Sequence, residues 1–170
     1  MKTLLLLRHA RPTAHSPTGR DFDRPLAAAG RDEARLVGQF LRREALAPDL
    51  LVCSPAARAR ETAALVAGAA LFPAATTTAA RFDERIYDAT AERLLEVVSE
   101  AAGDAGVVLV VGHNPGLAEL ILLLTGESAS VAPATLARVE LDIARWDEAR
   151  AATGRLIFAL APGETGGEDA

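Results

Sequence analysis

The sequence predicts an α/β fold, a three-layer α/β/α sandwich with a mostly parallel central sheet. Short runs such as "TLLLL" (3–7) and "VVLVVGH" (107–113) are apolar on both faces, as strands inside a covered sheet are. Segments with apolar residues at helical spacing lie between such runs through most of the 170 residues. This alternation is typical of a parallel sheet with helices on both faces.

The first half of the chain begins with a strand that runs into a long polar loop. The expected elements are a strand at 3–7, a loop at 11–25, a helix within 26–46 after its first few residues, a strand at 49–54 and a helix at 54–70. The loop is rich in Pro, Gly, Ser and Asp, which favour turns. For the second helix, we expect Ser54 as N-cap and Pro55 at the first helical position.

The second half continues the alternation and ends in a polar tail. The expected elements are a weaker strand at 76–82, helices at 90–103 and 114–126, and strands at 107–113, 136–144 and 155–161. Thr90 and Asn114 are the expected N-caps of the two helices, and Gly126 ends the second. We predict a single domain over 1–161 and a disordered tail over 162–170.

Composition limits the classes of partner. Half of the residues are hydrophobic, 24% are charged, and the net charge of −5 argues against a nucleic-acid-binding surface. No apolar stretch is long enough to cross a bilayer, so we expect no membrane association. A single cysteine, Cys53, excludes an internal disulfide, and a cytoplasmic location is the default expectation. No feature indicates an oligomeric state.

Polar residues come directly after three of the predicted strands, where a helix or a loop begins. The three segments are "LLLLRH" (4–9), "LLVCSPAARAR" (50–60) and "VLVVGHNPG" (108–116). In parallel sheets, ligands bind beyond the carboxyl ends of the strands. If the three strands are neighbours, Arg8, His9, Arg58 and His113 converge on one pocket. A lone histidine is more often a framework residue, but two His and two Arg at one sheet edge favour a functional site.

Two guanidinium groups and two imidazoles form an anion site, and phosphate is the natural guest. Arginine binds phosphate oxygens through two parallel hydrogen bonds, and its charge does not titrate away. Asn114 lies at the start of a helix, which adds free N–H groups at the same place. A neutral imidazole can attack phosphorus while a second one holds an oxygen. This chemistry requires neither a metal ion nor a cofactor, and we expect none.

The segments "LLLLRHA", "SPAARARETA" and "VVGHNPGLAEL" together resemble the histidine phosphatase superfamily. The resemblance spans roughly 3–125 and is greatest to the small bacterial phosphohistidine phosphatase branch. It implies a phosphoglycerate mutase-like fold, with His9 as the nucleophile that becomes phosphorylated. It also implies that Arg8, Arg58 and His113 form the rest of the phosphate pocket.

Some residues outside this pocket are candidates for contact with the part of the substrate beyond the phosphate. "DERIYDA" (83–89) resembles a mutase-like segment whose glutamate donates a proton, which makes Glu84 the candidate general acid. A like charge on a bound phosphate raises the pKa of a nearby carboxyl, as such an acid requires. The alternative is a solvated loop. Arg11, Arg20 and Arg24 either contact substrate or are solvated.

We therefore expect a metal-independent phosphatase with a phosphohistidine intermediate. The branch resemblance implies action on phosphohistidine in a phosphorylated protein. A phosphomonoesterase for a small phosphorylated metabolite would use the same pocket, and a non-catalytic phosphate-binding module is the third alternative. A cysteine-dependent phosphatase is excluded, because such enzymes need five residues between Cys and Arg and position 59 is alanine.

Overall fold

The structure is a computed structural model that describes residues 1–75 and 80–165, and it contains one six-stranded sheet. Its strands are β1 (Lys2–Arg8), β2 (Leu50–Cys53), β3 (Arg81–Phe82), β4 (Val107–Gly112), β5 (Leu136–Leu141) and β6 (Gly154–Leu160). The helices are α1 (Ala28–Arg43), α2 (Ala57–Ala70), α4 (Ala91–Ala102), α5 (Gly116–Thr125) and α6 (Pro162–Thr165). Short 3₁₀ turns are η1 (Asp21–Asp23), η2 (Glu84–Ile86) and η3 (Trp146–Glu148).

The strand order across the sheet is β3-β2-β4-β1-β5-β6. β1, β2, β3 and β4 pair in parallel, whereas β5 runs antiparallel to both of its neighbours, β1 and β6. β5 is therefore the one strand of this sheet that points the other way, and the predicted mostly parallel sheet is confirmed. Each parallel connection crosses the sheet through a helix, as parallel pairing requires.

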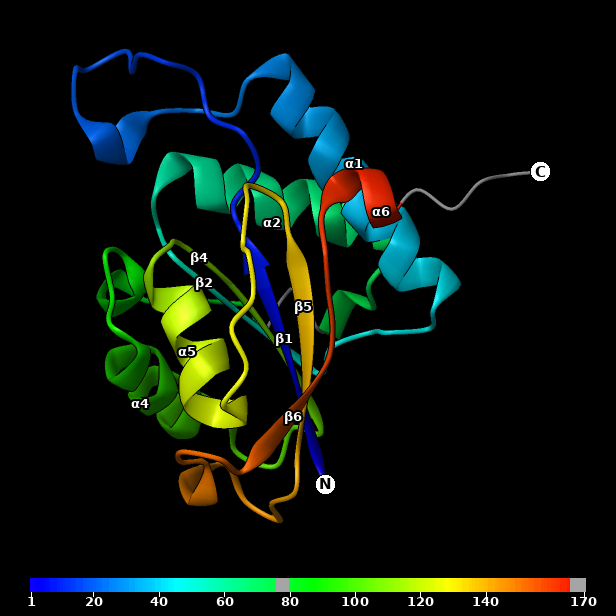
Figure 1. The fold of residues 1–170 in the computed structure, drawn as a ribbon. Helices are drawn as coiled ribbons and strands as arrows, with labels where there is room; N and C mark the ends of the chain where they lie inside the picture. The colour runs from blue at the N-terminus through cyan, green and yellow to red at the C-terminus, as the bar shows by residue number, and fades with distance from the viewer. Residues whose placement is uncertain (76–79, 166–170) are drawn as a thin grey trace.

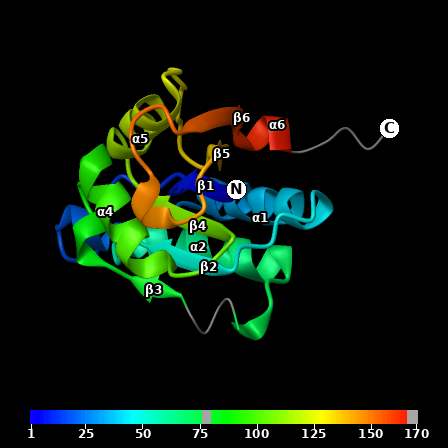
Figure 2. The same ribbon diagram turned by 90° about the horizontal axis from the view of Figure 1, so that it is seen from below.

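Helices cover both faces of the sheet, and the leucines of β1 show why (Figures 1 and 2). Leu5 and Leu7 point to the face covered by α1 and α2, while Leu4 and Leu6 point to the face covered by α4 and α5. All four are essentially inaccessible to solvent. An apolar run without alternation thus marks a strand between two helical layers, and the predicted three-layer sandwich is confirmed.

Several predicted boundaries need correction. α2 begins at Ala57, and its N-cap is Ala56, two residues after the predicted cap Ser54. α5 begins at Gly116, and its N-cap is Pro115 rather than Asn114. Ser54 and Asn114 instead lie in the turns between each strand and the helix that follows it. The caps at Thr90 and Gly126 are confirmed.

Two other predicted segments are described only in part. Within the predicted strand 76–82, only the pair Arg81–Phe82 is a strand, and positions 76–79 lie outside the described residues. In the predicted disordered tail, Pro162–Thr165 form α6, which packs on α1, and positions 166–170 lie outside the described residues. In the described part, no helix combines the length and the apolar character needed to cross a membrane.

The register of the sheet brings three strand ends to one edge. Arg8 in β1 lies beside Gly112 in β4, and Cys53 in β2 lies beside Val111 in β4. The residues that follow these strands, including His9 and His113, therefore leave the sheet side by side. This edge is where the predicted phosphate pocket is expected.

Candidate active site

Four predicted side chains meet at this edge, around a cavity of about 340 Å³. The rings of His9 and His113 lie with their centroids 5.1 Å apart. The Arg58 guanidinium lies against both, with Nε 3.3 Å from His9 Nε2 and Nη2 3.5 Å from His113 Nδ1. Arg8 also lines the cavity, so the structure brings together all four residues of the predicted pocket.

His9 is a buried imidazole in a defined orientation. Its Nδ1 lies 2.8 Å from the carbonyl oxygen of Ala10, which can only accept, so this nitrogen carries the proton. Its Nε2 therefore holds a lone pair, which accepts the Nε–H of Arg58 at 3.3 Å beside the cavity. Burial, followed by the charges of Arg58 and Arg8, lowers the pKa of His9 to about 4. At neutral pH His9 is uncharged and available as a nucleophile.

His113 is held from behind by a buried hydroxyl. Its Nε2 lies 2.7 Å from Ser54 Oγ, and Ser54 Oγ also accepts the N–H of Ala56 at 3.3 Å. The residue predicted to cap α2 therefore orients a pocket imidazole instead. Burial, followed by the neighbouring His9 and Arg58, lowers the pKa of His113 to about 3. Both imidazoles are neutral between two guanidinium groups.

Arg58 uses the two edges of its guanidinium for different partners. Nε and Nη2, which form the side-on edge, face the two imidazoles. The end-on edge is held by Asp21, whose carbonyl oxygen accepts from Nη1 at 2.8 Å and whose Oδ2 accepts from Nη2 at 3.0 Å. Asp21 thereby fixes the plane of the guanidinium, with the side-on edge at the cavity and its Nε–H donated to His9 Nε2. Two parallel N–H groups in that direction suit two phosphate oxygens.

Arg8 and Asn114 are tied to the same backbone carbonyl. The Val131 oxygen accepts from Arg8 Nη1 at 2.9 Å and from Asn114 Nδ2 at 2.8 Å. Arg8 Nε is buried and has no hydrogen-bond partner within the described residues. Burial and then the charge of Arg58 lower the pKa of Arg8. An unpaired buried N–H on one guanidinium group, with a second guanidinium group nearby, indicates a place for an anion.

Sequence reasoning missed Asp21 and Tyr87, which line the cavity and connect two loops. Tyr87 donates its hydroxyl to Asp21 Oδ2 at 2.8 Å, and Arg24 Nη1 donates to Asp21 Oδ1 at 3.0 Å. These bonds, with the Tyr87 hydroxyl as the largest contribution, hold the pKa of Asp21 well below its usual range. No periodicity or spacing in "RDFDR" distinguishes Asp21 from a solvated acid, so sequence alone has no signal for it.

Comparisons with known proteins agree with this geometry. The model of the histidine phosphatase superfamily (branch 1) matches residues 4–90. This chain belongs to the histidine phosphatase superfamily. An uncharacterized protein of Mycobacterium tuberculosis is 36% identical over 129 residues, which are 74% of this chain and 76% of that protein.

Two solved structures are similar over nearly the whole length of this histidine phosphatase. A proposed phosphohistidine phosphatase SixA from Nakamurella multipartitia is 29% identical, with a TM-score of 0.81, over 95% of this chain and 96% of that one. A second proposed SixA, from Agrobacterium tumefaciens, is 28% identical, with a TM-score of 0.77, over 95% and 98% of the two chains. These neighbours match the predicted small bacterial branch and the phosphoglycerate mutase-like fold.

The other predicted contact residues of this histidine phosphatase are dispersed. Glu84 is exposed and lines a neighbouring hollow together with Arg20, not the phosphate cavity. Arg24 lines the phosphate cavity itself. Arg11 lies outside both, in an exposed ion pair with Glu33 at 3.0 Å. The structure therefore separates the candidate acid from the four residues of the predicted phosphate pocket.

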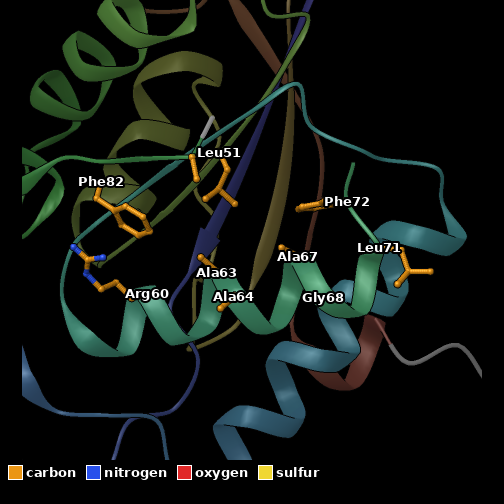
Figure 3. Close-up of a pocket in the computed structure, with 10 residues that line it drawn as sticks. Leu51, Arg60, Ala63, Ala64, Ala67, Gly68, Leu71, Phe72 and Phe82 are labelled. Carbon is orange, nitrogen blue, oxygen red and sulfur yellow. The ribbon is translucent and has the colours of Figure 1, made fainter. Parts of the chain in front are cut away.

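Cys53 and an apolar groove along α2 lie apart from this chemistry. Cys53 is buried, and its burial raises the pKa of the thiol to about 12, as suits a small core residue. The groove of about 510 Å³ lies along α2, between Arg60 and Leu71, and its walls are mostly alanine, leucine and phenylalanine (Figure 3). It contains neither histidine nor carboxylate, so it offers no group for phosphate chemistry. Within the described residues, no three His, Cys, Asp or Glu side chains are placed to share a metal ion.

Proposed function

We propose that this histidine phosphatase hydrolyses the phosphoryl group of phosphohistidine in proteins through a phosphorylated His9. The observation that carries the proposal is His9 Nε2, an unprotonated nitrogen that accepts from Arg58 Nε at a cavity lined also by Arg8 and His113. The similarity to two proposed phosphohistidine phosphatases at 29% and 28% identity supports this choice of substrate. Arg8, Arg58 and His113 are the proposed phosphate-binding residues, and Asn114 positions Arg8 by sharing its carbonyl partner.

In the first step, His9 Nε2 attacks phosphorus as the bond to the leaving nitrogen breaks. The side-on edge of Arg58 and the unpaired N–H of Arg8 hold the equatorial oxygens, where negative charge spreads in the transition state. If Ser54 donates its hydroxyl proton to His113 Nε2, the proton of that imidazole lies on Nδ1 and faces an oxygen. A leaving imidazole that is protonated on its other nitrogen departs as a neutral ring, so no further proton is required.

In the second step, a water oxygen attacks phosphorus and the bond to His9 Nε2 breaks. The lone pair returns to Nε2, the water proton passes to solvent, and inorganic phosphate leaves. The low pKa of His9 assists this step, because a neutral imidazole is a good leaving group. For substrates that leave as an alkoxide, Glu84 is the proposed proton donor from the neighbouring hollow.

A side-by-side measurement of kcat/KM tests the choice of substrate. The full chain is assayed with a phosphohistidine-bearing protein and with a panel of phosphorylated metabolites, with EDTA present and absent. We expect the protein substrate to be preferred and EDTA to have no effect. Preference for a metabolite would replace the proposal with the phosphomonoesterase, and binding without turnover would replace it with the phosphate-binding module. Loss in EDTA that a divalent ion restores would contradict the metal-independent mechanism.

A further inference from the structure

A second hollow, of about 580 Å³, opens beside the phosphate cavity. It is lined by Arg20, Asp21, Phe22, Glu84 and Tyr87, and we call it the side hollow. Asp21 and Tyr87 also line the phosphate cavity, so the two spaces share a wall. A group attached to phosphate in the cavity and passing this wall enters the side hollow.

The side hollow has an aromatic wall. The rings of Phe22 and Tyr87 meet edge to face, with centroids 5.2 Å apart and planes at 79°. Tyr87 in turn meets the ring of His113 edge to face at 5.3 Å. The aromatic wall therefore continues from the phosphate pocket into the side hollow. Aromatic pairs of this geometry favour a further planar ring over an alkyl group of similar size.

The two carboxyl groups of the side hollow, those of Asp21 and Glu84, differ in their hydrogen-bond partners. Asp21 is saturated by donors from Tyr87, Arg24 and Arg58. Glu84 is exposed, and its carboxyl has no hydrogen-bond or ion-pair partner among the described residues. One carboxyl beside an aromatic wall is therefore free to accept an N–H from a bound ring. A ring with both a planar face and an N–H fits these two features together.

We propose that the side hollow binds the leaving group of the substrate and selects a planar heteroaromatic ring with an N–H, such as the imidazole of phosphohistidine. The proposal rests on the proposed function, and it assigns the leaving-group preference to Phe22 and to the free carboxyl of Glu84. Phe22 supplies the ring face, and Glu84 accepts the N–H on the nitrogen that is not bonded to phosphorus. The phosphate residues are common to every substrate, whereas the side hollow distinguishes what is attached to phosphate.

Two substrates with the same type of bond isolate this contribution. Free phosphohistidine and phosphoramidate both carry a P–N bond, but phosphoramidate releases ammonia and has no ring. The measured quantity is the ratio of kcat/KM for phosphohistidine to that for phosphoramidate. Phe22→Ala should lower this ratio roughly fivefold to tenfold, the effect of losing one aromatic contact. Phe22→Leu, which keeps apolar volume, should lower it in the same direction.

Phe82→Ala is the matched control, because Phe82 is a solvent-exposed phenylalanine that lies in the groove of Figure 3 and outside the side hollow. Its ratio should equal that of the unmodified protein. An unchanged ratio in both Phe22 variants, or an equal fall in Phe82→Ala, overturns the proposal for the side hollow. The proposed function fails by a different result, in which the unmodified protein cleaves alkyl phosphates and neither P–N substrate.

Discussion

Arg58 shows how a single side chain divides its donors between structure and chemistry. Asp21 holds the end-on edge of the guanidinium, and the side-on edge lies against His9 and His113, where we propose that phosphate binds. Lysine keeps the charge but has no planar pair of donors. Arg58→Lys should therefore lower kcat about 100-fold, because losing one such transition-state contact costs about 3 kcal/mol.

The matched control for this variant is Arg60→Lys. Arg60 is exposed on the same helix, bonds the Pro55 carbonyl and lies over the ring of Phe82, outside the phosphate cavity. Its substitution should leave steady-state turnover near that of the unmodified protein. Near-normal turnover of Arg58→Lys would show that Arg58 does not contact the phosphoryl group in the transition state.

Glu84 separates two kinds of leaving group. An alkoxide needs a proton in the transition state, whereas a protonated imidazole does not. Glu84→Gln should lower kcat on alkyl phosphates about 100-fold and lower phosphohistidine turnover only a few-fold, through one weakened hydrogen bond. Parallel assays on the two substrates measure this. Negligible effects on both would show that Glu84 is a solvated surface residue.

The sequence predicts the residues of the pocket better than the residues that hold them in place. Arg8, His9, Arg58 and His113 are visible because each follows a buried strand at the same sheet edge. Asp21 is not visible, because its role depends on how the loop at 11–25 folds back over α2, and no local pattern specifies that return. Local capping propensity gives the wrong role for Ser54, because hydrogen bonding to His113 in the tertiary structure overrides it.

Among the elements, the loop at 11–25 is held in place by close backbone contact with α1. The Arg11 carbonyl accepts from Ala27 N–H at 3.0 Å, and an added Cβ at Gly30 would lie 2.1 Å from that oxygen. The Arg11 oxygen is a backbone atom, so it cannot move away from an added methyl group as the end of a flexible side chain can. Gly30→Ala should therefore lower the free energy of unfolding by about 1–3 kcal/mol, as overpacking does.

Gly68→Ala is the control for this element-scale prediction. Gly68 lies in α2 and has no atom within 4 Å of an added Cβ. Because alanine has the higher helix propensity, this variant should be about 0.5–1 kcal/mol more stable. Urea unfolding of the two variants compares them directly. Equal stability of Gly30→Ala and the unmodified protein would show that the loop does not depend on this contact.

The elements themselves follow closely from the sequence, and their ends follow less well. Helix and strand interiors follow apolar periodicity, and the weak predicted strand 76–82 is the exception, with only Arg81–Phe82 in the sheet. The N-caps of α2 and α5 lie two residues and one residue later than predicted, because Ser54 and Asn114 hydrogen-bond in the turns that precede the helices. In the turns at this edge, polar side chains hydrogen-bond around the pocket and are not the N-caps of the helices that follow.

Across the whole molecule, two neutral imidazoles are buried beside two guanidinium groups, which makes stability depend on pH. The pKa values of His9 and His113 are lowered to about 4 and about 3, below the value of about 6.5 in an unfolded chain. Below pH 6.5 the unfolded chain binds protons that the folded protein does not. Stability is therefore full above about pH 6.5 and is lost as the pH falls toward 4.

Unfolding in urea at a series of pH values tests this expectation. The free energy of unfolding should fall by roughly 2–4 kcal/mol between pH 7 and pH 5. His113→Gln removes one of the two groups, so its fall should be clearly smaller. An equal pH dependence of the variant and the unmodified protein would mean that His113 is not protonated more readily on unfolding.

We propose that His9 is the nucleophile, and trapping the phosphorylated intermediate tests this. The full chain is mixed briefly with substrate labelled in the phosphoryl group, quenched in base and digested for peptide mapping. We expect one label on His9, stable in base and lost in acid, and no label in His9→Ala. A label on Cys53 or on an aspartate, or turnover by His9→Ala at the unmodified rate, would contradict it.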